Sequence, residues 1–370
     1  MRFNTTGANN TALGKDALYA NTTGAYNIAV GGLAGKGITT GNRNIAIGNG
    51  SMENGTMTGA DNTAVGHNAL NLLGAANYNT AVGAYTLDST TTGSNNIAIG
   101  RSALGINTTG GSNTAVGTFA LDANTTASNN TALGYGALTA NTTGADNVSI
   151  GSGTMGQNLT GAQNIAVGTN SLANTTASNN TAVGNAAGHS ITSGTNNLTL
   201  GMDAGRSGSP GGNIVTGSNE IALGDENIAS AAIQVDWTVA SDARDKTDFT
   251  ALDLGLEFVK DLKPVTYKWD KRSKYGDKTA DDYDLTAQTP DGTHKEDWLD
   301  IGFKAQEVEA LEIAAGYNKD NSTNLVSSHT GDGKQMGLQY SKFVPILVKA
   351  IQEQNALIEA LTARITELEG

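Results

Sequence analysis

One pattern recurs along the first two thirds of the chain and limits the possible folds more than any other feature. The pentapeptide Asn-[Thr/Ile]-Ala-[Val/Ile/Leu]-Gly first occurs at residues 10–14 and returns, with small variations, at a nearly constant spacing. Most steps are 17 residues, with one of 18, one of 16 and a last one of 23. Such regularity indicates a repeat architecture. The closing glycines stand at positions 14, 31, 48, 66, 83, 100, 117, 134, 151, 168, 184, 201 and 224.

Each repeat has the pattern expected of one coil of a β-solenoid. Ile45 and Ile47 are two residues apart and share one face of a strand, whereas Ala46 points to the other face. Asn and Gly between the short apolar pieces suit turns that need a positive φ. A period of 17 leaves room for two strands of about four residues and two turns. Because a single coil cannot bury its apolar row, we expect stability to come from stacking of neighbouring coils.

Other interpretations of the Asn/Thr/Gly-rich repeats fit less well. Disordered tracts lack a strict apolar register, and the period accounts for the Asn-x-Thr triplets that match the glycosylation acceptor. Asp16, Asp61 and Asp146 fall at unrelated places in their repeats, which fits neither calcium-binding nonapeptides nor a recurring carboxylate pair for glycoside hydrolysis. We expect the isolated His67 and His189 to be surface residues rather than ligands.

The repeats over residues 4–224 resemble the head repeats of trimeric autotransporter adhesins and repeats in phage tail fibres. The resemblance implies a parallel β-roll built from three chains. Aromatic residues are sparse in the repeats, which argues against a sugar-stacking groove along this part of the chain and favours a spacer.

Charge changes abruptly near residue 240. Residues 1–240 carry 6 Lys/Arg and 11 Asp/Glu, whereas residues 241–370 carry 16 and 24. Both parts are acidic, which disfavours nucleic acid or an anionic membrane as a partner. We find neither a run of about 18 apolar residues nor an N-terminal export signal, so we expect no membrane insertion. The chain has no cysteine, so no disulfide framework or thiolate metal site is possible.

These observations predict a mainly β protein in four segments. The irregular segment before residue 241 contains a strand candidate with apolar residues two apart, at Ile233, Val235, Trp237 and Val239. We expect this segment to cap the last coil, and it is the first place to seek receptor contacts. The segments are a β-roll shaft (1–201), a capping segment with the last repeat (202–240), a small α+β domain (241–342) and a coiled-coil helix (343–370).

The segment from residue 241 onward alternates short helices and strands. Leu252, Leu256 and Val259 have helical spacing, and "KPVTYKW" predicts a strand opened by Pro264. "IGFKAQEVEAL" predicts a short strand followed by a helix, and residues 271–294 predict a polar surface loop.

The C-terminal segment predicts a coiled coil from Val344 onward. Apolar residues alternate at steps of four and three, as a coiled-coil seam requires. Gln354 is a polar layer in that seam, and the number of strands stays open from this segment alone. A single buried amphipathic helix is the alternative. The seam positions are Val344, Leu347, Ile351, Gln354, Ile358, Leu361, Ile365 and Leu368.

Four of these sequences, "SDARDK", "LEFVKDLKPVTYKW", "IGFKAQEVEAL" and the terminal heptads, occur in the order found in the intramolecular chaperone auto-processing domain. The resemblance covers residues 241–370 and implies a trimeric chaperone that cuts its own chain before the motif serine. Carried over to this sequence, the nucleophile is Ser241, the base is Lys246 and the scissile bond is Ala240–Ser241. Asp242 and Arg244 match the other motif positions, with supporting roles.

The implied chemistry sets a requirement for the lysine. A serine hydroxyl is a poor nucleophile until a base takes its proton. Lysine is a base only when neutral, so its pKa must fall well below the usual value of about 10.4. Burial and a neighbouring cation such as Arg244 would lower that pKa, whereas a close Asp245 would raise it. A surface serine and lysine in a polar loop is the alternative interpretation.

Together these features predict a homotrimeric phage tail fibre that attaches to a host surface and carries a self-cleaving chaperone. Near-identical repeats allow three chains to align one coil out of step, and a C-terminal domain that trimerises first would set their register. We expect a host receptor, glycan or protein, and a virion tail or adaptor protein as partners, no cofactor or metal, assembly in the host cytoplasm and an extracellular mature virion protein. A bacterial trimeric surface adhesin and a fibre-borne polysaccharide depolymerase are the alternatives.

Overall fold

The chain forms two compact units, residues 1–225 and residues 226–370. The boundary between them precedes the change in charge density at residue 240. Apart from Val239, which is exposed, the strand candidate before residue 240 lies outside the described residues. The computed structural model describes residues 1–210, 212–232, 234, 239–277, 283–318, 320 and 325–369.

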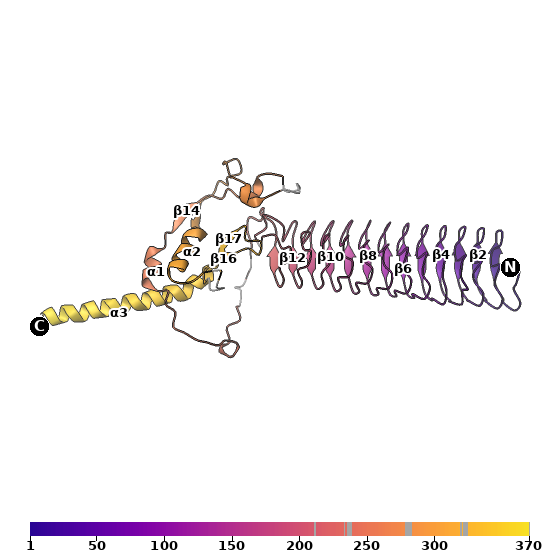
Figure 1. Ribbon diagram of the computed structural model, residues 1–370, viewed down its shortest axis with the longest axis horizontal. Coiled ribbons are helices and arrows are strands. Elements are labelled where there is room, and N and C mark those ends of the chain that lie inside the picture. Colours follow the sequence, from indigo (N-terminus) through magenta and orange to yellow (C-terminus); the bar gives the residue numbers. More distant parts are fainter. Residues whose placement is uncertain are drawn as a thin grey trace. The chain divides into compact units, whose positions relative to one another are not determined.

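The first unit is a parallel β-solenoid, as the repeats predict (Figure 1). Its strands pair in sequence order in one 13-stranded sheet, and every pair aligns the same position of successive repeats, as in Ala29 opposite Ala46 and Ala46 opposite Ala64. The strands are β1 (Thr11–Leu13), β2 (Ile28–Val30), β3 (Ile45–Ile47), β4 (Thr63–Val65), β5 (Thr80–Val82), β6 (Ile97–Ile99), β7 (Thr114–Val116), β8 (Thr131–Leu133), β9 (Val148–Ile150), β10 (Ile165–Val167), β11 (Thr181–Val183), β12 (Leu198–Leu200) and β13 (Ile221–Leu223).

The prediction of two strands per coil is wrong. In residues 1–210, all of which are described, each coil has one three-residue strand, and the Ala-Leu piece is a turn. Leu18 and Leu104 at this place have left-handed φ angles of 48° and 51° and are fully buried. Left-handed backbone costs roughly 1–2 kcal/mol for an L-residue, and complete burial of a leucine contributes about 1.5–3 kcal/mol. Burial therefore outweighs the local conformational preference.

The interior of the solenoid is a stack of small and branched apolar side chains. From β2 to β13 the middle residue of each strand, such as Ala46 or Ala98, points inward and is buried. Gly35 stands at the position that Leu18 occupies in the preceding coil. Ile38, three residues later, fills the space that a leucine would take, because a Cβ at Gly35 would lie 3.2 Å from Ile38 Cδ1. Gly188 and Ile191 repeat this exchange, which keeps the packed volume nearly constant.

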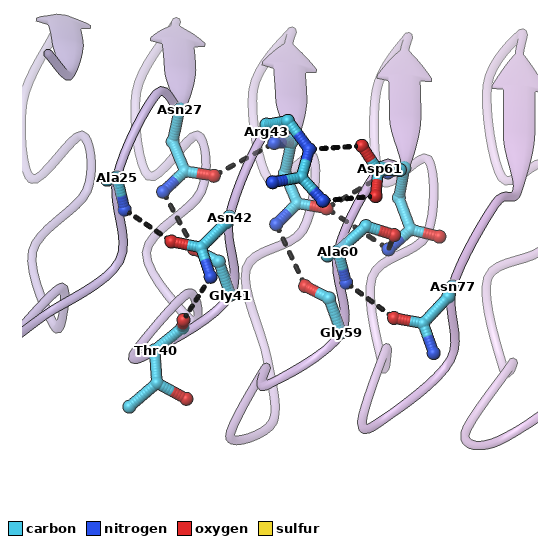
Figure 2. A network of polar contacts seen from close by, with 12 residues as sticks. Ala25, Asn27, Thr40, Gly41, Asn42, Arg43, Gly59, Ala60, Asp61 and Asn77 are labelled. Atoms are coloured by element: carbon cyan, nitrogen blue, oxygen red, sulfur yellow. Dashed lines mark hydrogen bonds and ion pairs between the residues drawn. The ribbon is translucent and has the colours of Figure 1, made fainter.

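A ladder of buried asparagines connects the coils (Figure 2). Asn27 Nδ2 donates to Gly41 O at 2.8 Å, and Asn44 N donates to Asn27 Oδ1 at 2.9 Å. Each side chain thus satisfies a turn carbonyl and a backbone N–H that stacking would otherwise leave buried without a partner. This explains why Asn opens the repeated pentapeptide. The same position is buried at Asn62, Asn79, Asn96, Asn113, Asn130, Asn147, Asn164, Asn180 and Asn197.

The glycine that closes the pentapeptide is required by close stacking. Gly31 has a φ of 134°, and a Cβ there would lie 2.7 Å from the carbonyl oxygen of Gly48 in the next coil. Any side chain would force the coils apart, which predicts glycine at this place in every repeat.

The outer face of the sheet is apolar and uncovered in the single chain. The first and third residues of each strand point away from the interior, and Ile97 and Ile99 are 43% and 41% exposed. The other large apolar residues exposed on this face are Leu13, Ile28, Ile47, Val82, Leu133, Ile165, Val183, Leu200, Ile221 and Leu223.

The second unit is a small α+β assembly. The first helix, the strand after Pro264, and the strand and helix of residues 300–314 lie close to where the sequence predicts them, whereas the strand pair in residues 327–338 was not predicted. Two antiparallel strand pairs form, β14 (Val265–Tyr267) with β15 (Asp300–Gly302) and β16 (Ser327–His329) with β17 (Met336–Leu338). Within the described residues, the helices are η1 (Ala243–Asp245), α1 (Leu256–Asp261), η2 (Arg272–Lys274), η3 (Leu285–Ala287), α2 (Ala305–Ala314), η5 (Tyr340–Lys342) and α3 (Phe343–Glu369).

The last helix has two different parts. Its first turns pack through Phe343, Ile346 and Ala350, which are buried. Glu353 Oε2 accepts a hydrogen bond from Leu256 N at 2.7 Å and thereby caps α1. Beyond this point the predicted seam residues, including Leu361 at 63% exposed, lie uncovered in the single chain. Among the described residues, no helix combines the length and apolar character needed to cross a membrane.

A buried carboxylate connects α2 to β16. The side chain of Glu312 is fully buried and accepts hydrogen bonds from Leu325 N at 2.8 Å, Val326 N at 2.6 Å and Ser327 N at 3.0 Å. The Ser327 hydroxyl also donates to it. Four donors compensate for the loss of water around the carboxylate.

Candidate functional site

The motif at residues 241–246 folds as one short turn. Asp242 is the N-cap of the 3-10 helix η1, and its Oδ1 accepts a hydrogen bond from Arg244 N at 2.9 Å. Lys246 N donates to Ala243 O at 3.3 Å and closes the turn. The turn lets the side chain of Lys246 reach back to Ser241, the first residue of the motif.

The turn brings the predicted nucleophile and base together. Lys246 Nζ lies 2.6 Å from Ser241 Oγ and 3.4 Å from the Ser241 carbonyl oxygen. The first distance is within direct hydrogen-bond reach, which is the geometric requirement for proton transfer from a serine hydroxyl to a base. Ala240, the other residue of the predicted scissile bond, directly precedes the pair and is exposed.

Asp242 and Arg244 pair with each other. Arg244 Nη2 lies 2.5 Å from Asp242 Oδ2, and Arg244 Nε lies 3.1 Å from both carboxylate oxygens. The side chain of Arg244, followed by its backbone N–H, holds the pKa of the Asp242 carboxyl below its usual value. The same ion pair raises the pKa of Arg244. The sequence argument expected the positive charge of Arg244 to act on Lys246. The negative charge of Asp242 largely offsets it.

The whole motif is exposed to solvent in the single chain. Ser241, Asp242, Arg244 and Lys246 are all exposed. The burial that the sequence argument requires around the lysine is not supplied by the described residues of this chain.

The two histidines of the solenoid differ. His67 is exposed, and its Nδ1 lies 3.1 Å from Asn49 O. His189 is half-buried rather than fully at the surface, and burial lowers its pKa. Among the described residues, no group of three or more His, Asp or Glu is placed to hold a metal ion.

Comparison with known families gives one match. Residues 241–317 match the family described as chaperone of endosialidase. The match begins at Ser241, the first residue of the motif turn, and ends shortly after α2. The solenoid lies outside the matched residues. No curated protein and no solved structure matches the chain.

The family match and the "SDARDK" motif both begin at Ser241. Sequence reasoning missed the Asp242–Arg244 pair, although opposite charges two residues apart around a turn were a usable signal. It also missed the four-donor site of Glu312, because the donors come from residues 325–327, which the sequence pattern does not connect to α2.

Proposed function

We propose that this chain is the subunit of a trimeric fibre, most simply a phage tail fibre that attaches to a host surface, and that its C-terminal segment is a chaperone that cuts the Ala240–Ser241 bond. The observation that carries the proposal is the 2.6 Å contact between Ser241 Oγ and Lys246 Nζ at the first residue of the chaperone of endosialidase match. Self-cleavage would leave residues 1–240 as the fibre.

The proposed reaction uses the two residues in turn. Neutral Lys246 takes the hydroxyl proton of Ser241 while Oγ attacks the carbonyl carbon of Ala240. The C–N bond breaks, the Ser241 nitrogen takes the proton from Lys246, and an ester joins Ala240 to Ser241 Oγ. Water then hydrolyses this ester, which leaves a carboxylate on Ala240 and a free hydroxyl on the new N-terminal Ser241. Asp242 and Arg244 act as positioning residues because their ion pair holds the turn.

The exposure of the motif supports a requirement for assembly. A solvated lysine is charged at neutral pH and is a poor base, and desolvation is what favours its neutral form. Since the described chain leaves Lys246 exposed, we propose that the other two copies cover it. Cleavage would then wait for the trimer.

Two uncovered apolar surfaces support the trimer. The outer face of the solenoid sheet presents apolar side chains from β1 to β13, and the second half of α3 presents the predicted seam. Exposed apolar surface of this extent marks an interaction site. Copies of the same chain match both surfaces in length and spacing, which favours self-association.

The same regularity explains why a chaperone is needed. Val116, Leu133 and Ile150 end successive strands, so a one-coil slip between chains exchanges similar apolar side chains. Only the terminal coils lose contacts. We propose that the C-terminal segment trimerises first and holds the chains level, after which the shaft closes from that end. The released shaft would owe its persistence to slow unfolding.

Replacement of Ser241 by Ala tests the catalytic assignment. We expect full-length chain on a heated gel, an SDS-resistant trimer on an unheated gel, and loss of the small product. Thr247→Ala, a neighbouring hydroxyl change, should cleave like the parent. Parent product should begin Ser-Asp-Ala-Arg by N-terminal sequencing. Normal cleavage of the Ser241→Ala chain would exclude Ser241 as the nucleophile.

A further inference from the structure

The aromatic side chains of the first unit take no part in its core. The core consists of alanine, leucine, a few methionine and isoleucine residues, and the asparagine ladder. None of the seven described Phe and Tyr residues of this unit is buried. Large aromatic side chains usually stabilise cores or interfaces, so their exposure here needs another explanation. The seven are Phe3, Tyr19, Tyr26, Tyr78, Tyr85, Phe119 and Tyr135.

Three of these aromatics belong to a row that crosses five successive coils. The row, here called the aromatic ladder, consists of His67, Tyr85, Arg101, Phe119 and Tyr135. Each member lies one or two residues after the glycine that closes its strand. His67 and Tyr85 meet edge to face at 5.2 Å between centroids, and Phe119 and Tyr135 do so at 6.2 Å. The Arg101 guanidinium lies 5.4 Å from the Phe119 ring centre.

Two ladder residues occupy strained backbone positions. Tyr85 and Phe119 have left-handed φ angles of 59° and 61°, which bulky residues seldom adopt. Such strain persists only where the surrounding structure fixes it, and here the stacked coils fix it. The same place is left-handed in the other coils from Asp16 to Asp203, where it carries residues such as Leu33 and Ala186 as well as residues that adopt this conformation more readily. The latter are Gly50, Asn68, Gly136, Gly153 and Asn170.

The ladder rests on a rigid base. Tyr85 N donates to His67 O at 2.9 Å, and Phe119 N donates to Arg101 O at 3.0 Å. The rings therefore project from backbone that is hydrogen-bonded from coil to coil. Little side-chain or backbone freedom is lost when such a surface binds a ligand, which favours affinity.

Charge and spacing point to the class of ligand. Arg101 forms none of the ion pairs found among the described residues, so its donors are available. Asp88 lies near His67, and the first 240 residues carry a net negative charge. A strongly anionic polymer would be repelled. Successive strands lie about 4.7–4.9 Å apart, close to the length of one sugar ring, so a linear chain of sugars can place successive rings over successive coils.

We propose that the aromatic ladder binds a linear polysaccharide of uncharged sugars that runs along the solenoid axis. The apolar faces of the sugar rings would pack on Tyr85, Phe119 and Tyr135, and sugar hydroxyls would accept hydrogen bonds from Arg101. The inference deepens the proposed attachment function and rests on it. It also revises the expectation that the shaft is only a spacer.

The test replaces ladder residues by the residues that other coils already carry. The variant is Tyr85→Asn, Phe119→Asn and Tyr135→Thr together, which copies Asn68, Asn170 and Thr118. Asn relieves the left-handed strain, so the fold should not be weakened. The matched control is Tyr26→Asn with Tyr78→Asn, which removes two exposed tyrosines, also at positive φ, outside the ladder.

Labelled full-length parent, variant and control protein are applied to an array of purified bacterial polysaccharides, uncharged and acidic. We expect the parent and the control to bind at least one uncharged polysaccharide and the variant to bind it at least about tenfold more weakly. The proposal is wrong if the parent binds no polysaccharide, if it binds only acidic ones, or if the variant binds as well as the parent.

Gels of the same samples show whether a negative array result counts against the aromatic ladder alone or against the proposed function. The variant should cleave and assemble like the parent. If it does and the array shows no loss, the ladder assignment fails while the chaperone and attachment proposals stand. Failure of the parent to cleave or to form a trimer would instead count against the proposed function.

Discussion

Lys246 Nζ and Ser241 Oγ are 2.6 Å apart because a single 3-10 turn, capped by Asp242, separates them. The contact is local in sequence, so the pairing does not depend on the packing of the remainder of the second unit. The turn does not shield these two side chains from water, since both residues are exposed in the single chain. Geometry is thus encoded within six residues, and the proposed cleavage would depend on assembly.

Replacement of Lys246 by Met should abolish cleavage while leaving assembly intact. Methionine has similar length but cannot take a proton, and loss of a catalytic base from such a pair typically lowers the rate at least about a thousandfold. Densitometry of heated gels over time measures the rate. Lys260→Met, which breaks only an exposed pair with Glu257, is the control and should cleave normally. Cleavage of the Lys246→Met chain at the parent rate would remove the lysine from the mechanism.

Replacement of Asn96 by Ala should destabilise the solenoid strongly. Asn96 Oδ1 accepts from Asn113 N at 3.0 Å, and Asn96 Nδ2 donates to Gly110 O at 2.9 Å. Loss of the side chain leaves both groups buried without these partners, at a cost of about 1–3 kcal/mol each. The rate of guanidinium-induced unfolding of the assembled shaft measures the change as a difference in the free-energy barrier to unfolding.

The control for this change is Asn95→Ser, because Asn95 directly precedes the buried Asn96 but is exposed. The substitution copies Ser112 of the following coil. Its effect should stay within about 0.5 kcal/mol. Equal effects of the two substitutions would show that the buried asparagines do not hold the coils together.

Asp284 should make the second unit acid-sensitive. Hydrogen bonds from Thr286, together with Lys334, lower the pKa of Asp284 to about 2. Because the folded value lies below the unfolded value of about 3.9, the stabilisation is complete above the unfolded pKa and is lost as the pH falls through the folded one. The melting temperature of the second unit should exceed that of Asp284→Asn at pH 5, and the two should converge near pH 2. A gap as large at pH 2 as at pH 5 would contradict this assignment.

The fold of the first unit was largely predictable from the sequence, because Asn, Ala and Gly of each pentapeptide have separate stereochemical duties. Asn27 must bond to the next coil, Ala46 must fit the interior, and Gly31 must allow close approach. The second strand of each coil was wrongly predicted because leucine disfavours the left-handed region. Only the stacked structure shows that burial of Leu18 overcomes that preference.

The candidate site was predictable in part. The resemblance identified Ser241 and Lys246, and the structure brings them together. The electrostatic surroundings of Ser241 and Lys246 were not predictable, because Arg244 pairs with Asp242 instead of facing Lys246 as a free cation. The aromatic ladder was also hidden: Tyr85 and Phe119 are 34 positions apart in the printed chain and align only when the coils stack.

The central claim is that the C-terminal segment sets the register of the three chains. It is tested most directly by producing residues 1–240 alone and full-length chain side by side, and measuring the yield of SDS-resistant trimer on unheated gels. We predict abundant trimer from the full-length chain and mostly aggregated or heterogeneous material from residues 1–240. An equal yield of uniform trimer from residues 1–240 alone would contradict the claim.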